Sequence, residues 1–280
     1  ILMFGKLGMP ALGAQGCGYA TSIVMWLQAL MMFNYVRSHR HYEGFELFKH
    51  WDWPNWSAIQ RLLRVGLPIG GTIFVEGSLF IAAALLIARL GPLPASAHLI
   101  AINWSALMFM VPLGLASAVT TRVGNALGRG EPEAARYAGL IGFVIVLVTQ
   151  TLSAGAMFLV PAFIVRIYTD DAAITAIAVS LLFFSAIFQY SDGIQICAAG
   201  ALRGLKDTLV PMFINILSYL FIGLSLGYYL TFNKAMGPAG MWIGMIAGLS
   251  FGAVLLSARF LFKSAALVKA APGQARGDVA

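Results

Sequence analysis

The sequence predicts an all-α polytopic membrane protein with seven transmembrane helices. Of its 280 residues, 60% are hydrophobic and only 10% are charged, whereas a soluble domain carries about 25% charged residues. Seven apolar runs are also long enough to cross a hydrocarbon core of about 30 Å, which takes about 20 residues in a helix. Because lipid offers no hydrogen-bond partners to the backbone, these runs are predicted to be helices. This composition argues against a soluble enzyme, a disordered chain and a nucleic-acid-binding protein.

The seven predicted spans follow one another with short connections. The spans cover residues 13–36, 66–90, 96–121, 138–163, 174–200, 210–231 and 239–262. The first is too long for a cleaved signal peptide and has no basic segment before it. Only the connection 37–65 is long, and none of the connections is expected to hold a folded domain outside the membrane.

The basic residues predict the orientation of the spans. If the first span ends in the cytoplasm, only four of the 18 Lys and Arg residues lie on the outer side, namely Lys6, Arg89, Arg166 and Lys234. The other fourteen then lie on the cytoplasmic side, as the positive-inside rule requires. The net charge of +7 therefore sets topology and needs no polyanionic partner. The C-terminus is predicted to be cytoplasmic.

The segment 37–65 contains three tryptophans, Trp51, Trp53 and Trp56, followed by Arg61 and Arg64. Tryptophan beside basic residues is typical of a segment that lies along the lipid headgroups. We therefore predict a cytoplasmic interfacial linker. A substrate or partner site is the alternative.

Small residues predict close packing of the last two spans. Gly240, Gly244, Gly248 and Gly252 repeat at every fourth position of the last span, and Gly223 and Gly227 do so in the span before it. Such a face lets a neighbouring helix approach closely. Packing within one bundle is the expected role, and dimerisation is the alternative. Pro112 is expected to kink the third span.

Two carboxylates lie deep within the predicted spans. Nine of the 11 acidic residues fall in connections or in the tail, whereas Glu76 and Asp192 fall inside the second and fifth spans. Measured from the span centres at about 1.5 Å per residue, Glu76 lies about 3 Å and Asp192 about 7–8 Å towards the cytoplasm. The two acids are thus predicted to lie at similar depth on antiparallel helices, where they can line one cavity. The basic residues fall in connections or near helix ends, so neither acid has an obvious salt-bridge partner.

A buried carboxylate without a partner is expected to bind a proton or another cation, as in a cation-coupled carrier. Polar neighbours indicate a wet cavity: Gln189, Tyr190 and Gln195 surround Asp192, Thr72 is close to Glu76, and Asn103 lies on the third span. The alternative is that each acid is a neutral, hydrogen-bonded packing residue. His98, near the outer end of the third span, is either a proton-handling group or, more simply, a hydrogen-bonded residue of the core or the helix end.

Motifs of other chemistries are absent from the sequence. It has no G-x-x-x-x-G-K-[ST] phosphate loop, and it has no serine–histidine–acid set or zinc-ligand spacing at a water-facing depth. We therefore expect no enzyme activity and no cofactor.

Three segments resemble the multidrug and toxic compound extrusion (MATE) family, and the NorM-like branch above all. They are RVGLPIGGTIFVEGSLF (64–80), AHLIAINWSALMFMVPLGLASAVTTRVGNALGRG (97–130) and FQYSDGIQICAAGALRGLKDT (188–208). The resemblance implies twelve helices in two six-helix lobes, and export of cationic or amphipathic compounds in exchange for sodium ions or protons. It implies that residues 1–36 are the last helix of the N-terminal lobe, 37–65 the linker, 66–263 the C-terminal lobe and 264–280 a cytoplasmic tail. The rest of the N-terminal lobe would be missing and would be required for activity.

The resemblance also assigns roles to the two buried acids. Glu76 and Asp192 match the glutamate and aspartate that form the cation site of the C-terminal lobe in NorM-like members, and they would hold Na⁺ in a sodium-coupled protein. Two positions depart from the family pattern: Leu99 stands where a glutamine often follows the histidine, and Phe188 lacks a tyrosine hydroxyl that some sodium-using members have. Sodium and proton coupling both stay open.

The predicted function is thus a cation-coupled multidrug antiporter of the bacterial inner membrane, with the lipid bilayer and cationic small molecules as partners and no nucleic acid. One alternative is a related lipid-linked oligosaccharide flippase, although no Lys or Arg is predicted at mid-membrane to bind a diphosphate. The other is a seven-helix receptor or rhodopsin-like protein, although the last span has no internal lysine for a Schiff base.

Overall fold

The computed structural model describes residues 12–38 and 55–270. The chain divides into two compact units, Ile1–Ile59 and Gln60–Ala280. The first unit contains helix α1 (Gly13–Ser38), which covers the first predicted span. Trp51 and Trp53 of the predicted interfacial linker lie outside the described residues, and Trp56 is the first residue of α2.

The second unit is a bundle of long helices. Six helices of the described chain are long and apolar enough to cross a membrane. They are α2 (Trp56–Ala88), α3 (Pro92–Gly128), α4 (Pro132–Leu159), α6 (Ala172–Gly204), the composite helix Leu209–Asn233, and α9 (Pro238–Ala270). A short helix, α5 (Pro161–Arg166), connects α4 to α6. Because α1 is not among the six, the count of seven spans stays a prediction.

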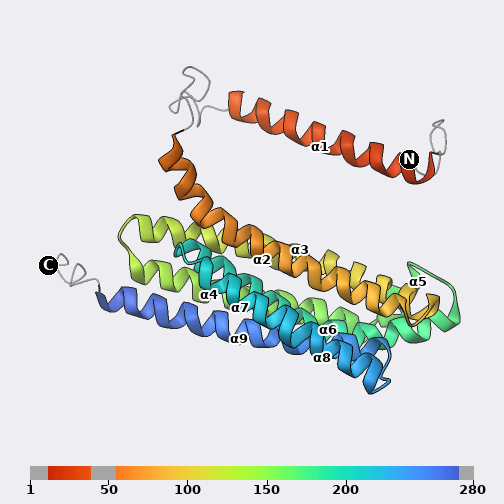
Figure 1. Ribbon diagram of the computed structural model, residues 1–280. Coiled ribbons are helices and arrows are strands. Elements are labelled where there is room, and N and C mark those ends of the chain that lie inside the picture. Colours follow the sequence, from red (N-terminus) through yellow and green to blue (C-terminus); the bar gives the residue numbers. More distant parts are fainter. Residues whose placement is uncertain (1–11, 39–54, 271–280) are drawn as a thin grey trace. The chain divides into compact units, whose positions relative to one another are not determined.

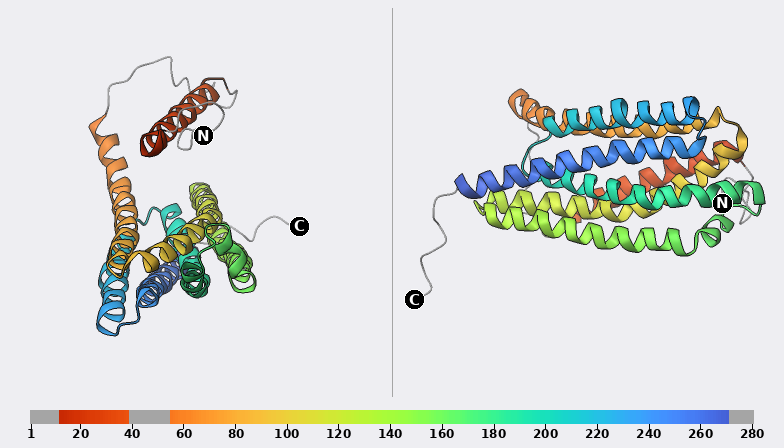
Figure 2. Two further views of the ribbon diagram at one scale, coloured as in Figure 1. Left: turned by 90° about the vertical axis from the view of Figure 1, so that its right-hand side faces the viewer. Right: turned by 90° about the horizontal axis from the view of Figure 1, so that it is seen from below.

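The long helices of the bundle run side by side, and consecutive helices point in opposite directions (Figures 1 and 2). Their connections are short, with only three residues between α2 and α3 and three between α3 and α4. Proline is the first residue of both α3 and α4, where its missing N–H has no intrahelical acceptor to lose. Gly130 follows α3 at a φ of 78°, a backbone conformation that favours glycine.

The helices extend beyond the apolar runs that predicted them. Helix α2 begins at Trp56, ten residues before the predicted start at 66, and α9 continues to Ala270. An apolar run marks only the part of a helix in contact with hydrocarbon, whereas the helix itself continues into the headgroup layer. Residues 56–65 are therefore helical, although they were expected within the linker.

The composite helix Leu209–Asn233 combines α and π turns. It consists of α7 (Leu209–Ile216), η2 (Leu217–Leu224, π), α8 (Ser225–Tyr228) and η3 (Tyr229–Asn233, π). The sequence predicts one span here but not its π turns, because apolar periodicity does not distinguish a π turn from an α turn.

The composite helix packs backbone to backbone against α9. A Cβ atom added at Gly244 would lie 2.3 Å from the Cα of Gly227, and one added at Gly248 would lie 2.5 Å from the carbonyl oxygen of Ser218. The predicted role of these glycines in packing within one bundle is confirmed.

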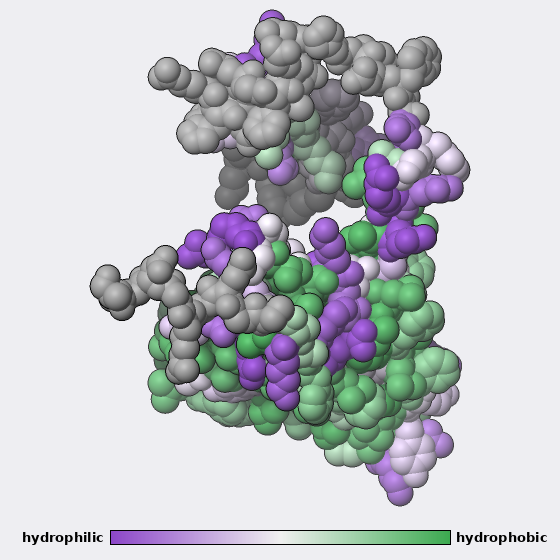
Figure 3. All heavy atoms as spheres, turned by 90° about the vertical axis from the view of Figure 1, so that its left-hand side faces the viewer, coloured by the Kyte–Doolittle hydropathy of each residue, from purple (hydrophilic) through white to green (hydrophobic). Residues whose placement is uncertain are grey.

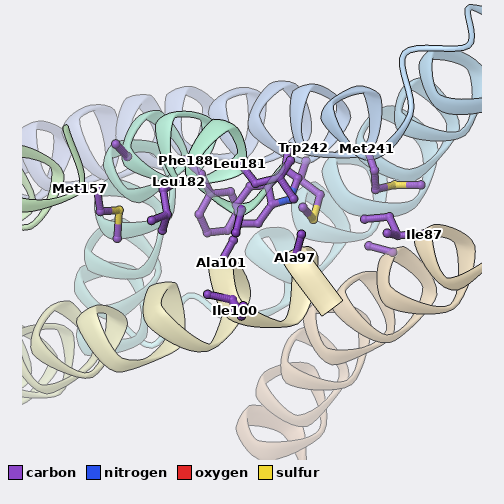
Figure 4. Close-up of a cluster of buried hydrophobic side chains, with 14 of the residues drawn as sticks. Ile87, Ala97, Ile100, Ala101, Met157, Leu181, Leu182, Phe188, Met241 and Trp242 are labelled. Atoms are coloured by element: carbon purple, nitrogen blue, oxygen red, sulfur yellow. The ribbon is translucent and has the colours of Figure 1, made fainter. Parts of the chain in front are cut away.

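Large side chains fill the middle of the bundle. Phe188 and Trp242 are buried and pack edge to face, with ring centroids 5.6 Å apart. Figure 4 shows them among aliphatic side chains of α3, α6 and α9. Pro112 is buried inside α3, which remains a continuous helix from Pro92 to Gly128.

One end of the bundle is hydrophilic. Figure 3 looks onto the end at which α6 and α9 finish, where hydrophilic side chains gather, while hydrophobic side chains cover the flanks. Here Asp207, in the connection between α6 and α7, accepts a 2.8 Å hydrogen bond from Arg259 Nε and lies 3.0 Å from Lys263 Nζ. Burial tends to raise the pKa of the Asp207 carboxyl, but the hydrogen bonds from Arg259 and Lys263 outweigh it and lower that pKa below its usual value. This cluster fixes the connection to the end of α9.

Candidate cation-binding site

Glu76 and Asp192 line the same two cavities. The first cavity, of about 40 Å³, lies between α2, α6 and α7–η2, and the second, of about 250 Å³, lies between α2, α3 and α6. The first has room for one or two water-sized species. The acids therefore share a pocket, as their similar predicted depth allowed.

Helical periodicity explains how two helices form the first cavity. Helix α6 contributes Asp192, Gln195, Ile196, Ala199 and Arg203, and these positions repeat at the spacing of one helix face. Helix α2 contributes residues 69, 72, 73 and 76 in the same way. Because α2 and α6 run in opposite directions, their polar residues meet along one slot.

The carboxylates have few partners inside the bundle. Asp192 is 5% exposed. Within residues 12–38 and 55–270, no hydrogen bond or salt bridge involves either carboxylate. Glu76 is half-buried. An ionised carboxylate at such a depth is costly unless a cation or proton compensates it.

Amide and hydroxyl groups complete the wall of the first cavity. Gln195 donates from its Nε2 to Asn215 Oδ1 at 3.0 Å and also hydrogen-bonds the Tyr219 hydroxyl. Thr72 lines the cavity too, although its hydroxyl donates to the carbonyl of Pro68 at 3.0 Å. Carboxylate, amide and hydroxyl oxygens are the ligands that hard cations prefer. The wall can therefore offer oxygen ligands to a sodium ion or a carboxylate to a proton.

The second cavity is more apolar. It is lined by Phe80, Ile102, Phe109 and Phe188 in addition to the two acids and Ser105. The rings of Phe80 and Phe188 meet edge to face with centroids 6.0 Å apart. Phe188 therefore places an aromatic ring, without a hydroxyl, beside the acid pair.

Three of the residues predicted to line the cavity lie elsewhere. Gln189 is fully buried on another side of α6, where it accepts from Gln150 Nε2 at 3.0 Å and donates to the Ser105 carbonyl. Tyr190 donates to Thr151 Oγ1 at 3.2 Å, and Asn103 is exposed on α3. Proximity in sequence to Asp192 was a poor guide, because neighbours along a helix point about 100° apart.

Four polar residues of the first cavity were missed from the sequence, namely Arg203, Thr208, Asn215 and Tyr219. Arg203 was placed at the end of its helix and was not expected near the acids, yet it lines their cavity. The cavity is thus not free of basic side chains, contrary to the expectation. Asn215 and Tyr219 were hidden in an apolar run, although their i, i+4 spacing marks a polar face that could have identified them.

His98 belongs to the core and not to this site. It is 2% exposed, and its ring packs edge to face on Trp242 with centroids 5.8 Å apart. Its burial favours the interpretation as a core residue, but the hydrogen bond expected of it is not found, because its buried Nδ1 has no hydrogen-bond partner in the described part of the chain.

Comparison with known proteins relates this chain to a family of transporters. A probable multidrug resistance protein NorM of Xanthomonas campestris pv. campestris is 51% identical over 260 residues, which cover 93% of this chain and 57% of the relative. The multidrug resistance protein PmpM of Pseudomonas aeruginosa is 44% identical over 262 residues, 92% of this chain and 55% of the relative. The chain thus spans little more than half the length of these relatives.

Solved structures of the same fold are more distant in sequence. The outward-facing conformation of a multidrug resistance MATE family transporter of the MOP superfamily matches with a TM-score of 0.82 at 20% identity, over 96% of this chain and 59% of that one. The eukaryotic MATE transporter AtDTX14 matches with a TM-score of 0.78 at 21% identity, over 96% and 60%. These likenesses establish the fold. The family model MatE, whose members are transporters and not enzymes, matches residues 68–229. The chain therefore belongs to the MatE family.

Proposed function

We propose that this chain is part of a cation-coupled multidrug efflux transporter of the bacterial inner membrane. Glu76 and Asp192 would bind the coupling ion, sodium or a proton, and the transporter would export cationic or amphipathic compounds by alternating access. The observation that carries the proposal is that Glu76 and Asp192, from two different spans, line the same cavities. Membership in the MatE family and the names of the NorM and PmpM relatives support it.

The charge of the two carboxylates would couple binding of the ion to binding of the substrate. Two ionised carboxylates attract a cationic substrate, and the arrival of the coupling ion neutralises part of that charge. A bound ion shifts a conformational equilibrium only by its differential affinity for the two states. The ion would therefore have to bind the acid pair more tightly in the state that faces its source.

Residues 66–263 would form the C-terminal lobe and residues 1–36 the last helix of the N-terminal lobe, with the C-terminus in the cytoplasm. The MatE match favours this assignment over a seven-helix receptor and over a lipid-linked oligosaccharide flippase. Because one lobe lines only half of such a transport path, we expect residues 1–280 alone to be inactive in proteoliposomes.

Dye efflux from cells tests the role of the acids. The twelve-helix protein that we propose contains this chain would carry Glu76→Gln or Asp192→Asn, and the matched control would be Glu133→Gln, at an exposed acid of the first turn of α4. Both cavity variants should lose efflux at equal expression, whereas the control should keep it. Efflux at the wild-type rate in both cavity variants would refute the proposal.

A further inference from the structure

The cavity that holds the acid pair also holds one guanidinium, which has no role in the proposed coupling. Arg203 lines the first cavity together with Glu76 and Asp192. It lies in the last turn of α6, eleven residues after Asp192. Eleven residues make about three helical turns, so both side chains project from the same face of α6, about 16 Å apart along its axis.

The direction of helical side chains brings Arg203 closer to the acids than its position in the chain suggests. In a helix, each Cα–Cβ bond tilts towards the N-terminus. For Arg203 this direction leads along the slot to Asp192. Its long aliphatic stem can run along Ile196 and Ala199, which lie between them on the same wall. The separation along the axis is about 16 Å at 1.5 Å per residue. Subtracting the part of the arginine side chain that points back along the helix leaves about 12 Å between the charges.

The guanidinium of Arg203 makes no hydrogen bond or salt bridge in the described part of the chain. Its side chain is partly buried, and its buried Nε–H has no hydrogen-bond partner there. The neighbouring charges at this end are committed elsewhere, since Asp207 is engaged by Arg259 and Lys263. Arg203 forms no salt bridge within residues 12–38 and 55–270, so it balances the cavity's charge at a distance.

The formal charges of the cavity can be counted. Its titratable and charged groups are Glu76, Asp192, Arg203 and the phenol of Tyr219. With both acids ionised and the phenol neutral, the net charge is −1. One monovalent cation then neutralises the cavity, whereas two would be needed without the guanidinium.

We propose that Arg203 is the resident counter-cation of the acid pair, which sets both the affinity of the cavity for the coupling ion and the number of monovalent cations that neutralise it. This inference rests on the proposed role of the acids and adds a residue that tunes them. Removing a unit charge about 12 Å away, at an effective dielectric constant of about 20, changes a binding constant about tenfold. A neutral residue at position 203 should therefore make the pair bind a cation about tenfold more tightly.

Protonation of the acid pair can be followed by infrared spectroscopy on the purified 280-residue chain. The proton is a suitable probe because every carboxylate binds it, whichever ion is used in transport. The carboxyl bands would be assigned by their loss in Glu76→Gln and Asp192→Asn. In Arg203→Gln, the proton concentration at half-protonation should fall about tenfold, and at the pH where the wild type holds one proton the variant should approach two.

Two variants isolate the charge from the side chain. Arg203→Lys keeps the charge and should titrate like the wild type. Arg122→Gln removes a cation near the same end of the bundle, outside the acid cavity, and should leave the titration unchanged. Arg203→Met replaces the glutamine variant if that variant does not fold.

An acid titration that does not move in the neutral variants, or that moves equally in Arg203→Lys, overturns this inference. So does a pair that stays fully protonated across the accessible pH range in the wild type. These outcomes are independent of the efflux assay: efflux that survives loss of the acids refutes the proposed function, whereas an unmoved titration refutes only the role of Arg203.

Discussion

The contact between the composite helix and α9 allows a graded test of the packing. Gly244→Ala would place a Cβ atom 2.3 Å from both the Cα and the N of Gly227. Ordinary contact begins at 3.4 Å, so the two helices would have to separate by 3.4 − 2.3, or about 1.1 Å. A backbone cannot rotate away as a side chain can. Overpacking costs about 1–3 kcal/mol, and we expect the upper end, about 3 kcal/mol, because the obstacle is rigid.

Two further glycines calibrate this cost within the same chain. Gly71→Ala would meet only the flexible end of Met212, with its Sδ atom at 2.8 Å, and should cost less than about 1 kcal/mol. Gly114→Ala, inside α3, meets nothing within 4 Å. It should be neutral or slightly stabilising, because alanine favours a helix over glycine by up to about 1 kcal/mol.

Unfolding of the three purified variants in a graded series of denaturing detergent, followed by circular dichroism, would measure these differences. The expected order of stability is Gly114→Ala, then Gly71→Ala, then Gly244→Ala. If Gly244→Ala unfolds together with Gly114→Ala, the backbone contact does not exist and the glycine face serves another purpose. Size-exclusion chromatography of Gly244→Ala should show no change of oligomeric state, because the contact lies within one chain.

Three further predictions concern polar contacts. Asp207→Asn should destabilise the bundle by about 1–3 kcal/mol at pH 7, the cost of weakened charge-assisted hydrogen bonds. Because the folded pKa of Asp207 is lowered, its contribution is present above about pH 4 and is lost as the pH falls further, so thermal melts of the variant and the wild type should converge at low pH. Arg129→Gln, which breaks the exposed 2.8 Å pair with Glu131, should leave the melting temperature unchanged, since exposed pairs contribute little, and a clear drop would contradict this. Asn215→Leu should cost about 1–3 kcal/mol in detergent unfolding, because it removes one of the two acceptors of the buried Gln195 amide and leaves only the Tyr219 hydroxyl; a variant as stable as the wild type would show that the bond to Tyr219 is sufficient.

The fold class and the acid pair could be predicted from the sequence because both depend on properties that act along single helices. The length and apolarity of a run determine whether it can cross a bilayer, and each of the six candidate spans of the described chain overlaps a predicted run. Glu76 and Asp192 stood out because charge is rare in such runs. Their similar depth followed from the rise per residue, and they do line common cavities.

Other features of the site depend on the direction in which each side chain points around its helix axis, which depth along that axis does not describe. Gln189 and Tyr190 are at the same depth as Asp192 but face α3 and α4. Arg203 is three turns away in sequence but shares the face of Asp192. A helical projection of α6 places Arg203 about 20° and Tyr190 about 160° from Asp192, a difference that simple proximity in sequence does not show.

The sequence alone determined that this chain is helical, that it belongs in a membrane, and that two acids lie deep in it, because hydrophobicity and charge are properties of individual residues and short runs. Only the tertiary structure decided which polar side chains surround those acids. Asn215 and Tyr219 reach the cavity from the composite helix, and their place there depends on how tightly Gly223, Gly227 and Gly244 let that helix approach α9. Such contacts join residues far apart in the chain, so they arise from the packing of the whole bundle and not from any one of its helices.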